Sequence, residues 1–472
     1  MINLSNIFNK NREAAAMAKA ELAAFLKITP EALKAFENAY AMYSINTNKD
    51  GNDQFYMNAK QATALNHNRM DENAAFDADL EDRIVKELLC RTVIYSYDGI
   101  KAEVINFSEM EDEKPVTASE ILNLPAECRP QLSGNLVQKD INEDSASILL
   151  MQYKNYLEEK SPEKKQYWYS LFRQGLDILD LDPVTYEILG MNLNSIGNWF
   201  PPLVDAVKKQ DFFLLPKTKI MKVPLSLLQQ TRMDYTLLTP ATLRIVDHFC
   251  MQAFSLDEEQ EYFIKTGTYS SKFDFRNTHI KGAKEVRELG EYLLFIQFQA
   301  QQMAGPLNNP CIYGMSTTNE WVVREFIQDK ENNPCIYEGM PLHTEYRVFV
   351  DFDTDEILGI NPYWDPDIMK QRFGHERDAD SPHQIHDYVI YQMHEQMLME
   401  RYDKNKNLVL KKLAEMVPML ELSGQWSVDV MQNGEDFYII DMALACNSAM
   451  NHCVPKEKLK QVEENWIPQL PG

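Results

Sequence analysis

Residues 425–447 constrain the fold of this chain more than any other segment. They form two apolar runs around an Asn433-Gly434 pair, which predicts two antiparallel strands joined by a tight turn. Each run contains one aspartate, Asp429 in the first and Asp441 in the second. Because unpaired carboxylates are costly to bury, coordination of a metal ion is a natural reason for both.

The length of the turn decides which face each aspartate occupies. A two-residue Asn-Gly turn would pair Asp429 with Tyr438 and leave Asp441 on the opposite face of the sheet. A three-residue loop with a bulge would pair Asp429 with Ile439 and bring Asp441 to the same face, with the two Cα atoms about 7–8 Å apart. One Mg²⁺ can join the carboxylates only in the second case, so we predict the three-residue loop.

Residues 263–274 predict a phosphate-binding loop. A short strand ends in Lys265, and the loop that follows carries Ser270, Ser271 and Lys272. The amides and hydroxyls of such a loop can surround phosphate oxygens, while a lysine on a rigid strand supplies a point charge. An ordinary strand end followed by a solvated turn is the alternative.

Residues 321–327 place the charged pair Arg324-Glu325 between apolar residues. A segment that crosses between two lobes can offer its backbone to an adenine edge, and an acidic side chain can bind an amino group or a ribose. Phe326 and Ile327 complete this predicted hinge. A buried strand with one ion pair is the alternative.

Residues 345–351 alternate strictly between polar and apolar side chains. This pattern places Glu345 and Arg347 on one face of a strand and the apolar residues on the other. Arg347 suits bidentate binding of phosphate, and Glu345 suits a metal or a substrate amine. A salt bridge along one surface is the alternative.

Composition excludes several classes of protein. The 472 residues predict two or three compact units, and the formal net charge of −24 argues against nucleic acid or anionic lipid as a partner. The seven cysteines are scattered and contain no CxxC pair, so we expect a reducing, cytoplasmic setting. No signal peptide is expected, and no apolar run approaches the roughly 20 residues of a membrane span.

The predicted fold class is α+β, because the candidate strands are closely spaced and few crossover helices separate them. Residues 1–190 predict a mainly helical domain with a small hairpin around Asp98-Gly99. Residues 191–472 predict a second region, divided into 191–255 and 256–472. A helical insert is expected at 363–420.

Taken in order, these segments resemble the ATP-grasp superfamily over residues 194–452. Pro216-Lys217-Thr218 resembles the Pro-x-Thr that opens the nucleotide-binding part of that family. The serine-rich loop after Lys265 and the strand of Arg347 are similar to divergent ATP-grasp families of phages and bacteria. They are also similar to the eukaryotic assembly chaperone of translation initiation factor two.

The resemblance implies an ATP-grasp fold, in which two α+β lobes clasp a nucleotide, with ATP and Mg²⁺ as cofactors. It implies Lys265 and Arg347 as catalytic residues that stabilise a transferring phosphoryl group. The metal ligands that it implies are Asp429, Asp441 and Asn447. The nucleotide-binding residues that it implies are Lys265, Ser270, Ser271, Lys272, Arg324, Glu325, Phe326, Ile327 and Arg347.

Two functions from different classes follow from the resemblance. The first is an ATP- and Mg²⁺-dependent ligase that joins a peptide or small carboxylate to an amine through an acyl-phosphate. The alternative is a nucleotide-binding assembly chaperone that holds a protein partner without ligation. A degenerate ATP-grasp fold with a structural role is a third, weaker interpretation.

Overall fold

The structure is a computed structural model that describes residues 77–107, 192–228, 238–303, 318–373 and 382–460, with single positions and short stretches between 116 and 190. Most of the predicted N-terminal domain, including residues 1–76, lies outside these ranges. The described chain forms two main β-sheets with helices packed against them, so the α+β fold class is confirmed.

The first sheet has six strands in the order β2-β1-β4-β7-β5-β6, and every neighbouring pair is antiparallel. Its strands are β1 (Val93–Tyr97), β2 (Ala102–Asn106), β4 (Thr218–Lys222), β5 (Tyr262–Thr266), β6 (His279–Ile280) and β7 (Glu320–Glu325). The hairpin predicted at Asp98-Gly99 is confirmed as β1 and β2, with Gly99 at a φ of 97°. Because β1 pairs with β4, the predicted boundary at residue 190 separates strands that share one sheet.

Helices cover one face of the first sheet. They are α5 (Ala78–Cys90), α12 (Pro240–Phe254), α13 (Gly282–Arg287) and α14 (Leu289–Met303). Thr239 caps α12 by accepting a hydrogen bond from Thr242 N, and Pro240 occupies the first turn, as its sequence predicts. Ile84, Phe249 and Leu293 pack with Trp321 of β7 in the core beneath this face.

The second sheet has five strands in the order β11-β10-β12-β13-β3. Its strands are β3 (Phe213–Leu214), β10 (Thr344–Asp351), β11 (Glu356–Pro362), β12 (Gln425–Asn433) and β13 (Asp436–Leu444). All pairs are antiparallel except β13 with β3, which is parallel. The face of β10 predicted to be apolar is confirmed, because Tyr346, Val348 and Val350 lie in one core cluster.

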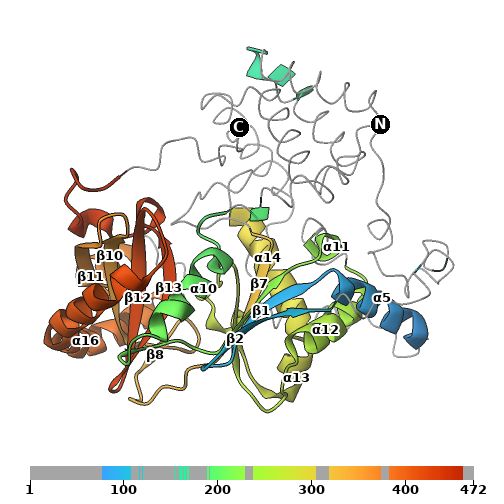
Figure 1. Cartoon of the computed structure of the whole chain (residues 1–472), viewed down its shortest axis with the longest axis horizontal. Helices are drawn as coiled ribbons and strands as arrows, with labels where there is room; N and C mark the ends of the chain where they lie inside the picture. Colours follow the sequence, from blue (N-terminus) through green and yellow to red (C-terminus); the bar gives the residue numbers. More distant parts are fainter. Residues whose placement is uncertain are drawn as a thin grey trace.

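Two helices complete the core of the second sheet. They are α10 (Ile196–Val207) and α16 (Pro382–Met416), and they pack against the same apolar side chains of β10, β12 and β13. In Figure 1, α10 lies between the orange and red second sheet and the first sheet. Ile220 and Val322 of the first sheet join this cluster, so α10 packs against both sheets.

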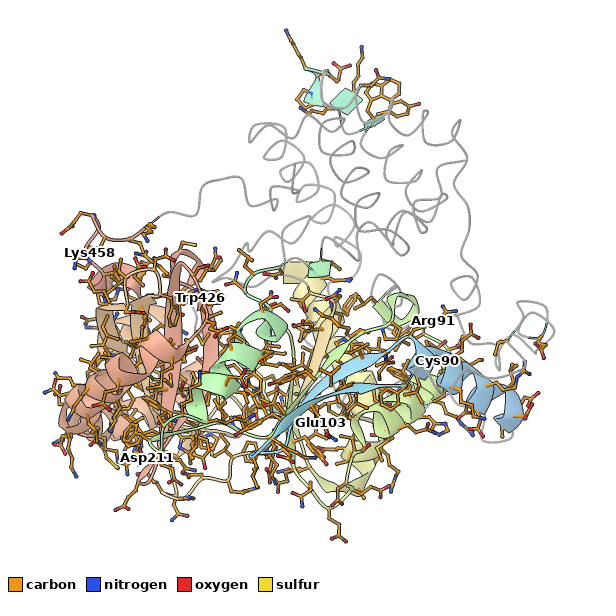
Figure 2. The ribbon with its side chains drawn as sticks, in the orientation of Figure 1. Cys90, Arg91, Glu103, Asp211, Trp426 and Lys458 are labelled. Atoms are coloured by element: carbon orange, nitrogen blue, oxygen red, sulfur yellow. The ribbon has the colours of Figure 1, made fainter. Side chains whose placement is uncertain are left out.

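The remaining elements are short. They are α11 (Leu225–Leu228), α15 (Pro366–Phe373), β8 (Cys335–Ile336), β9 (Met340–Pro341), and the 3₁₀ turns η7 (Phe275–Asn277), η10 (Val417–Met419), η11 (Ala445–Asn447) and η12 (Asn451–Cys453). α15, α16 and η10 fall within 363–420, where the sequence predicts a helical insert. Figure 2 shows Glu103 of β2 in the first sheet and Trp426 of β12 in the second. Within the described ranges, no helix combines the length and apolar character needed to cross a membrane.

Candidate functional site

A cavity of about 770 Å³ receives side chains from the loop after β5, from β10, β12 and β13, and from α15. This volume lies within the range of sites for small molecules and cofactors. Seven predicted residues line it, namely Ser270, Ser271, Lys272, Arg347, Asp429, Asp441 and Asn447. The structure therefore brings together the predicted phosphate loop, the predicted metal ligands and the arginine strand.

A bulge in the β12–β13 pair places the two aspartates on one face. Near the turn, Val430 pairs with Ile439, but one residue further on Asp429 pairs directly with Asp441, which leaves Ile440 as the extra residue. The predicted three-residue loop is wrong, since Asn433 pairs with Asp436 across a two-residue turn at Gly434-Glu435. The predicted bulge and the shared face are confirmed, although the partner of Asp429 is Asp441 rather than Ile439.

Four polar residues form a row across the second sheet. Asn361 pairs with Arg347, Arg347 with Asp429, and Asp429 with Asp441, on four neighbouring strands. Arg347 donates two hydrogen bonds to Asp429, from Nε to Oδ1 at 2.8 Å and from Nη2 to Oδ2 at 2.6 Å. Although burial opposes its charge, the Asp429 carboxylate raises the pKa of Arg347. This bidentate geometry holds both side chains in fixed positions.

Lys265 crosses from the first sheet to the second. Its Nζ lies 3.0 Å from Asp441 Oδ1, and its side chain is 4% exposed whereas that of Asp441 is 44% exposed. Burial lowers the pKa of Lys265. Burial also opposes the charge of Asp441, but Lys265 and Arg324 together hold the pKa of that carboxyl below its usual range. Asp441 therefore presents a charged oxygen to the cavity.

Lys272 and Glu345 lie beside this row. Lys272 Nζ donates to Tyr363 Oη at 2.6 Å, and the Arg347 guanidinium lies 4.8 Å from the centre of the same ring. Burial raises the pKa of Glu345 to about 7, with a further contribution from Asp429, while Lys272 and Arg347 act in the opposite direction. Glu345 is therefore a carboxyl that changes its charge near neutral pH.

The loop after β5 is anchored through the side chain of Ser271. Ser271 adopts the left-handed backbone region with a φ of 54°, and its hydroxyl donates to Gln299 Oε1 at 2.6 Å. Asn277 Nδ2 donates to the same hydroxyl at 2.9 Å. These contacts engage the Ser271 side chain and hold this part of the loop in place at the cavity wall.

The predicted adenine hinge lies elsewhere. Glu325, Phe326 and Ile327 are not among the described residues that line the cavity. Glu325 N donates to Lys217 O and Phe326 N donates to Glu261 O, because β7 lies between β4 and β5 and both its edges are paired. The Phe326 ring stacks on His279 with the ring centres 4.0 Å apart. These backbone amides are thus already engaged within the first sheet.

Arg324 is buried in contact with β13 and α10. Its Nη1 donates to Ile440 O, the carbonyl of the bulged residue, and its guanidinium lies 5.5 Å from the ring centre of Phe200. Burial lowers the pKa of Arg324 to about 10, although Asp441 opposes this change. Arg324 is not among the described residues of the cavity wall.

No role was predicted for residues 192–195, which precede α10, yet Asn194 lines the cavity. Asn194 Nδ2 donates to Asn447 Oδ1 at 3.1 Å, and its Oδ1 accepts from Leu444 N at 2.7 Å. Trp199 Nε1 donates to Asn194 O at 3.3 Å. The concentration of asparagine, glycine and tryptophan in residues 192–200 was the available signal.

The same segment connects α10 to the first sheet. Ser195 Oγ and Gly197 N both donate to Glu320 Oε2, and Lys222 donates to the other oxygen of that buried carboxylate. A Cβ atom at Gly197 would collide with the Glu320 carboxylate, so a side chain cannot be accommodated there. Ile196 N also donates to Gly267 O at 3.0 Å, at the start of the phosphate loop.

The donors around the cavity fit a magnesium-bound anion. Two neighbouring carboxylates and the Asn447 amide are oxygen ligands of the kind that Mg²⁺ prefers. Among the described residues, no set of three or more His, Cys, Asp or Glu side chains is arranged as a metal centre. Mg²⁺ commonly binds through one or two carboxylates plus phosphate oxygens, so two aspartates suffice.

Two solved structures resemble part of the chain. Cdc123 from Schizosaccharomyces pombe, in a C-terminally truncated form, gives a TM-score of 0.32 at 13% identity over 55% of this chain and 86% of that one. A second structure of Cdc123 from the same organism gives 0.32 at 14% identity, over 54% and 86% of the two chains. No protein-family model and no curated protein matches the sequence.

Proposed function

We propose that the chain binds Mg²⁺ and ATP in this cavity, and that the bound nucleotide serves a factor that holds a protein partner. The observation that supports the proposal most directly is the bulge in β13, because it sets Asp429 and Asp441 side by side, with Lys265 beyond them. Two carboxylates on the cavity wall, one of them paired with a buried lysine that is itself outside the described wall, suit the needs of a magnesium-bound polyphosphate.

Each residue has a role that its position supports. Asp441 is the more exposed of the two aspartates and would hold Mg²⁺, with Asp429 and Asn447 beside it. When bound, the ion would neutralise charge on the phosphates. Lys265 and Lys272 supply positive charge from the two ends of the phosphate loop. The apolar part of the wall, which includes Met369, Met442 and Met450, suits a purine base.

The use of the bound nucleotide has two candidates. The main cations of the second sheet and of β5 are already paired, Arg347 with Asp429 and Lys265 with Asp441. The α15 side of the wall is largely apolar, which suits a neutral or apolar group of a partner better than a free carboxylate. A factor that holds a protein partner is therefore the first candidate. A carboxylate-amine ligase is the second, because Lys272 could bind a substrate carboxylate at the wall.

Calorimetry of the full chain with Mg²⁺ and a non-hydrolysable ATP analogue tests the proposal. We expect saturable binding that is lost in Lys265→Met and Asp441→Asn. Lys330→Met is the matched control, since Lys330 forms an exposed pair with Asp436 on the β12–β13 hairpin. Absence of binding in the wild type, or equal binding in Asp441→Asn, would contradict the proposal.

A second measurement separates the two uses. ADP release from ATP is followed with and without mixtures of small carboxylates and amines. Release that depends on both substrates supports the ligase, whereas nucleotide binding with no substrate-dependent release supports the partner-holding factor.

A further inference from the structure

Arg324 is a predicted ligand-binding residue that lies outside the described cavity wall and is buried among protein groups. It is 4% exposed, and Nη1 forms its only hydrogen bond within the described residues, to Ile440 O. Its Nε and Nη2 are buried without a partner in the same part of the chain. A buried guanidinium with one hydrogen bond is costly, so a specific task at this position is expected.

The carbonyl that Arg324 binds belongs to the bulged residue. Ile440 is the extra residue that shifts the pairing of β13, and this shift brings Asp441 opposite Asp429. Without the shift, Asp429 would pair with Ile440, and Asp441 would lie on the face that packs against α16. The conformation at Ile440 therefore decides whether the cavity contains a second carboxylate.

The position of Arg324 is fixed by its place on β7 and by its contacts with α10. Along β7, Glu320, Val322 and Arg324 share one face by strand alternation, and each of them contacts α10 or its first turn. The Arg324 guanidinium lies within 6.0 Å of the ring centres of both Trp199 and Phe200. These aromatic faces favour a cation and restrict its movement.

We infer that Arg324 is a positioning residue, which holds the bulge carbonyl of Ile440 and thereby fixes Asp441 on the cavity wall without touching the ligand. The positive charge of Arg324 also favours the ionised form of the Asp441 carboxyl. The inference rests on the proposed function only for the identity of the ligand that Asp441 would meet. The link from Arg324 to Asp441 can be measured without any ligand.

A double-mutant cycle on the ligand-free protein tests the link. Urea midpoints are compared for wild type, Arg324→Met, Asp441→Asn and the double variant. If Arg324 acts through Asp441, the double variant unfolds at nearly the same urea midpoint as the less stable of the two single variants. Losses that simply add would overturn the inference. Arg83→Lys is the control, because Arg83 is a buried arginine of α5 that pairs with Glu120, remote from the bulge.

Binding of Mn²⁺, a spectroscopic probe for Mg²⁺, tests the consequence for the cavity. Electron paramagnetic resonance is used to measure Mn²⁺ affinity in the presence of the ATP analogue. Loss of a residue that orients a metal ligand typically lowers metal affinity by about 10- to 100-fold, and we expect a loss of that size in Arg324→Met. Arg324→Lys, which keeps the charge and one donor, should restore part of it. Affinity for the analogue without divalent ion should change far less.

The remaining outcomes are distinct. If Arg324→Met weakens the analogue equally with and without metal, Arg324 contacts the nucleotide and the inference is wrong. If neither affinity changes, it is also wrong. If the wild type binds neither nucleotide nor Mn²⁺, the proposed function fails, and the ligand-free cycle still decides whether Arg324 positions Asp441.

Discussion

The two sheets place their charged groups by different means. On the second sheet, Arg347, Asp429 and Asp441 occupy neighbouring strands at one level, so strand pairing fixes their spacing. On the first sheet, one buried lysine lies next to the last residue of β5, and the loop that follows carries other predicted phosphate ligands. Paired strands give a rigid spacing whereas loops allow adjustment, so we expect the second sheet to set the geometry that any ligand of the cavity would meet.

The largest effect is expected inside the second sheet, in Asp429→Asn. The substitution leaves the Arg347 guanidinium buried without its counter-ion, which typically costs about 3–5 kcal/mol. The free energy of unfolding in urea measures the loss. Asp436→Asn, in an exposed pair with Lys330 on the same hairpin, should lose no more than about 0.5 kcal/mol. Equal losses in the two variants would show that burial does not distinguish them.

Glu345 tests how the second sheet responds to pH. Burial raises its pKa to about 7, above the value of about 4.3 expected in the unfolded chain, so the folded state holds the proton longer. The contribution of this group to stability is therefore greatest below about pH 4 and falls as the pH rises through about 7.

Glu345→Gln should remove this fall. The free energy of unfolding of the variant, relative to that of wild type, should rise by up to about 3 kcal/mol from about pH 5 to about pH 8, because each pKa unit corresponds to 1.36 kcal/mol. Urea unfolding at the two pH values measures the difference. A variant whose stability differs from wild type equally at both would contradict the assigned role of Glu345.

Asp441→Asn tests the contact between the sheets. Because the Asp441 side chain is 44% exposed, water can replace part of the lost ion pair, and Lys265 can release its proton. We expect a loss of about 1–2 kcal/mol, smaller than for Asp429. The free energies of unfolding of Asp429→Asn and Asp441→Asn are measured in one urea series. A larger loss for Asp441→Asn would show that the contact between the sheets matters more for stability than the ion pair inside the second sheet.

The smallest effect is expected on the first sheet, in Glu325→Gln. Glu325 pairs with Lys217 at 3.0 Å, and both side chains are well exposed, so the change should stay within about 0.5 kcal/mol. Nucleotide binding should also be unchanged, because Glu325 is outside the described cavity wall. A marked loss of binding would restore the predicted hinge.

The sequence allowed the faces of individual strands to be predicted, because side-chain alternation is a local property. On β10 it placed Glu345 and Arg347 together correctly. The bulge was also inferred, but from the chemical need to bring two carboxylates together. Its position was not visible in the apolar pattern, because Tyr438 and Ile440 are apolar as well. In the structure, the core residues of β13 change from odd positions at Phe437 and Ile439 to even positions at Met442 and Leu444.

Features that depend on distant neighbours were not predictable. The predicted hinge stays a prediction, but the engagement of its backbone was not foreseen, because β7 lies between β4 and β5 and no local pattern reveals strand order. The role of Asn194 depends on Leu444 and Asn447, about 250 positions away along the chain. Such contacts arise only when the two sheets meet.

The outer edge of β13 has a consequence for the solubility of the protein. β3 pairs only with Phe437 and Tyr438, so beyond these two residues no described strand pairs with this edge, and an edge without a strand partner can recruit strands from other chains. Two side chains cover it in place of a strand, because Arg324 binds the carbonyl of Ile440 and Asn194 accepts from the amide of Leu444. Loss of either would expose an edge in a strongly apolar strand, and self-association through β13 is the failure to expect.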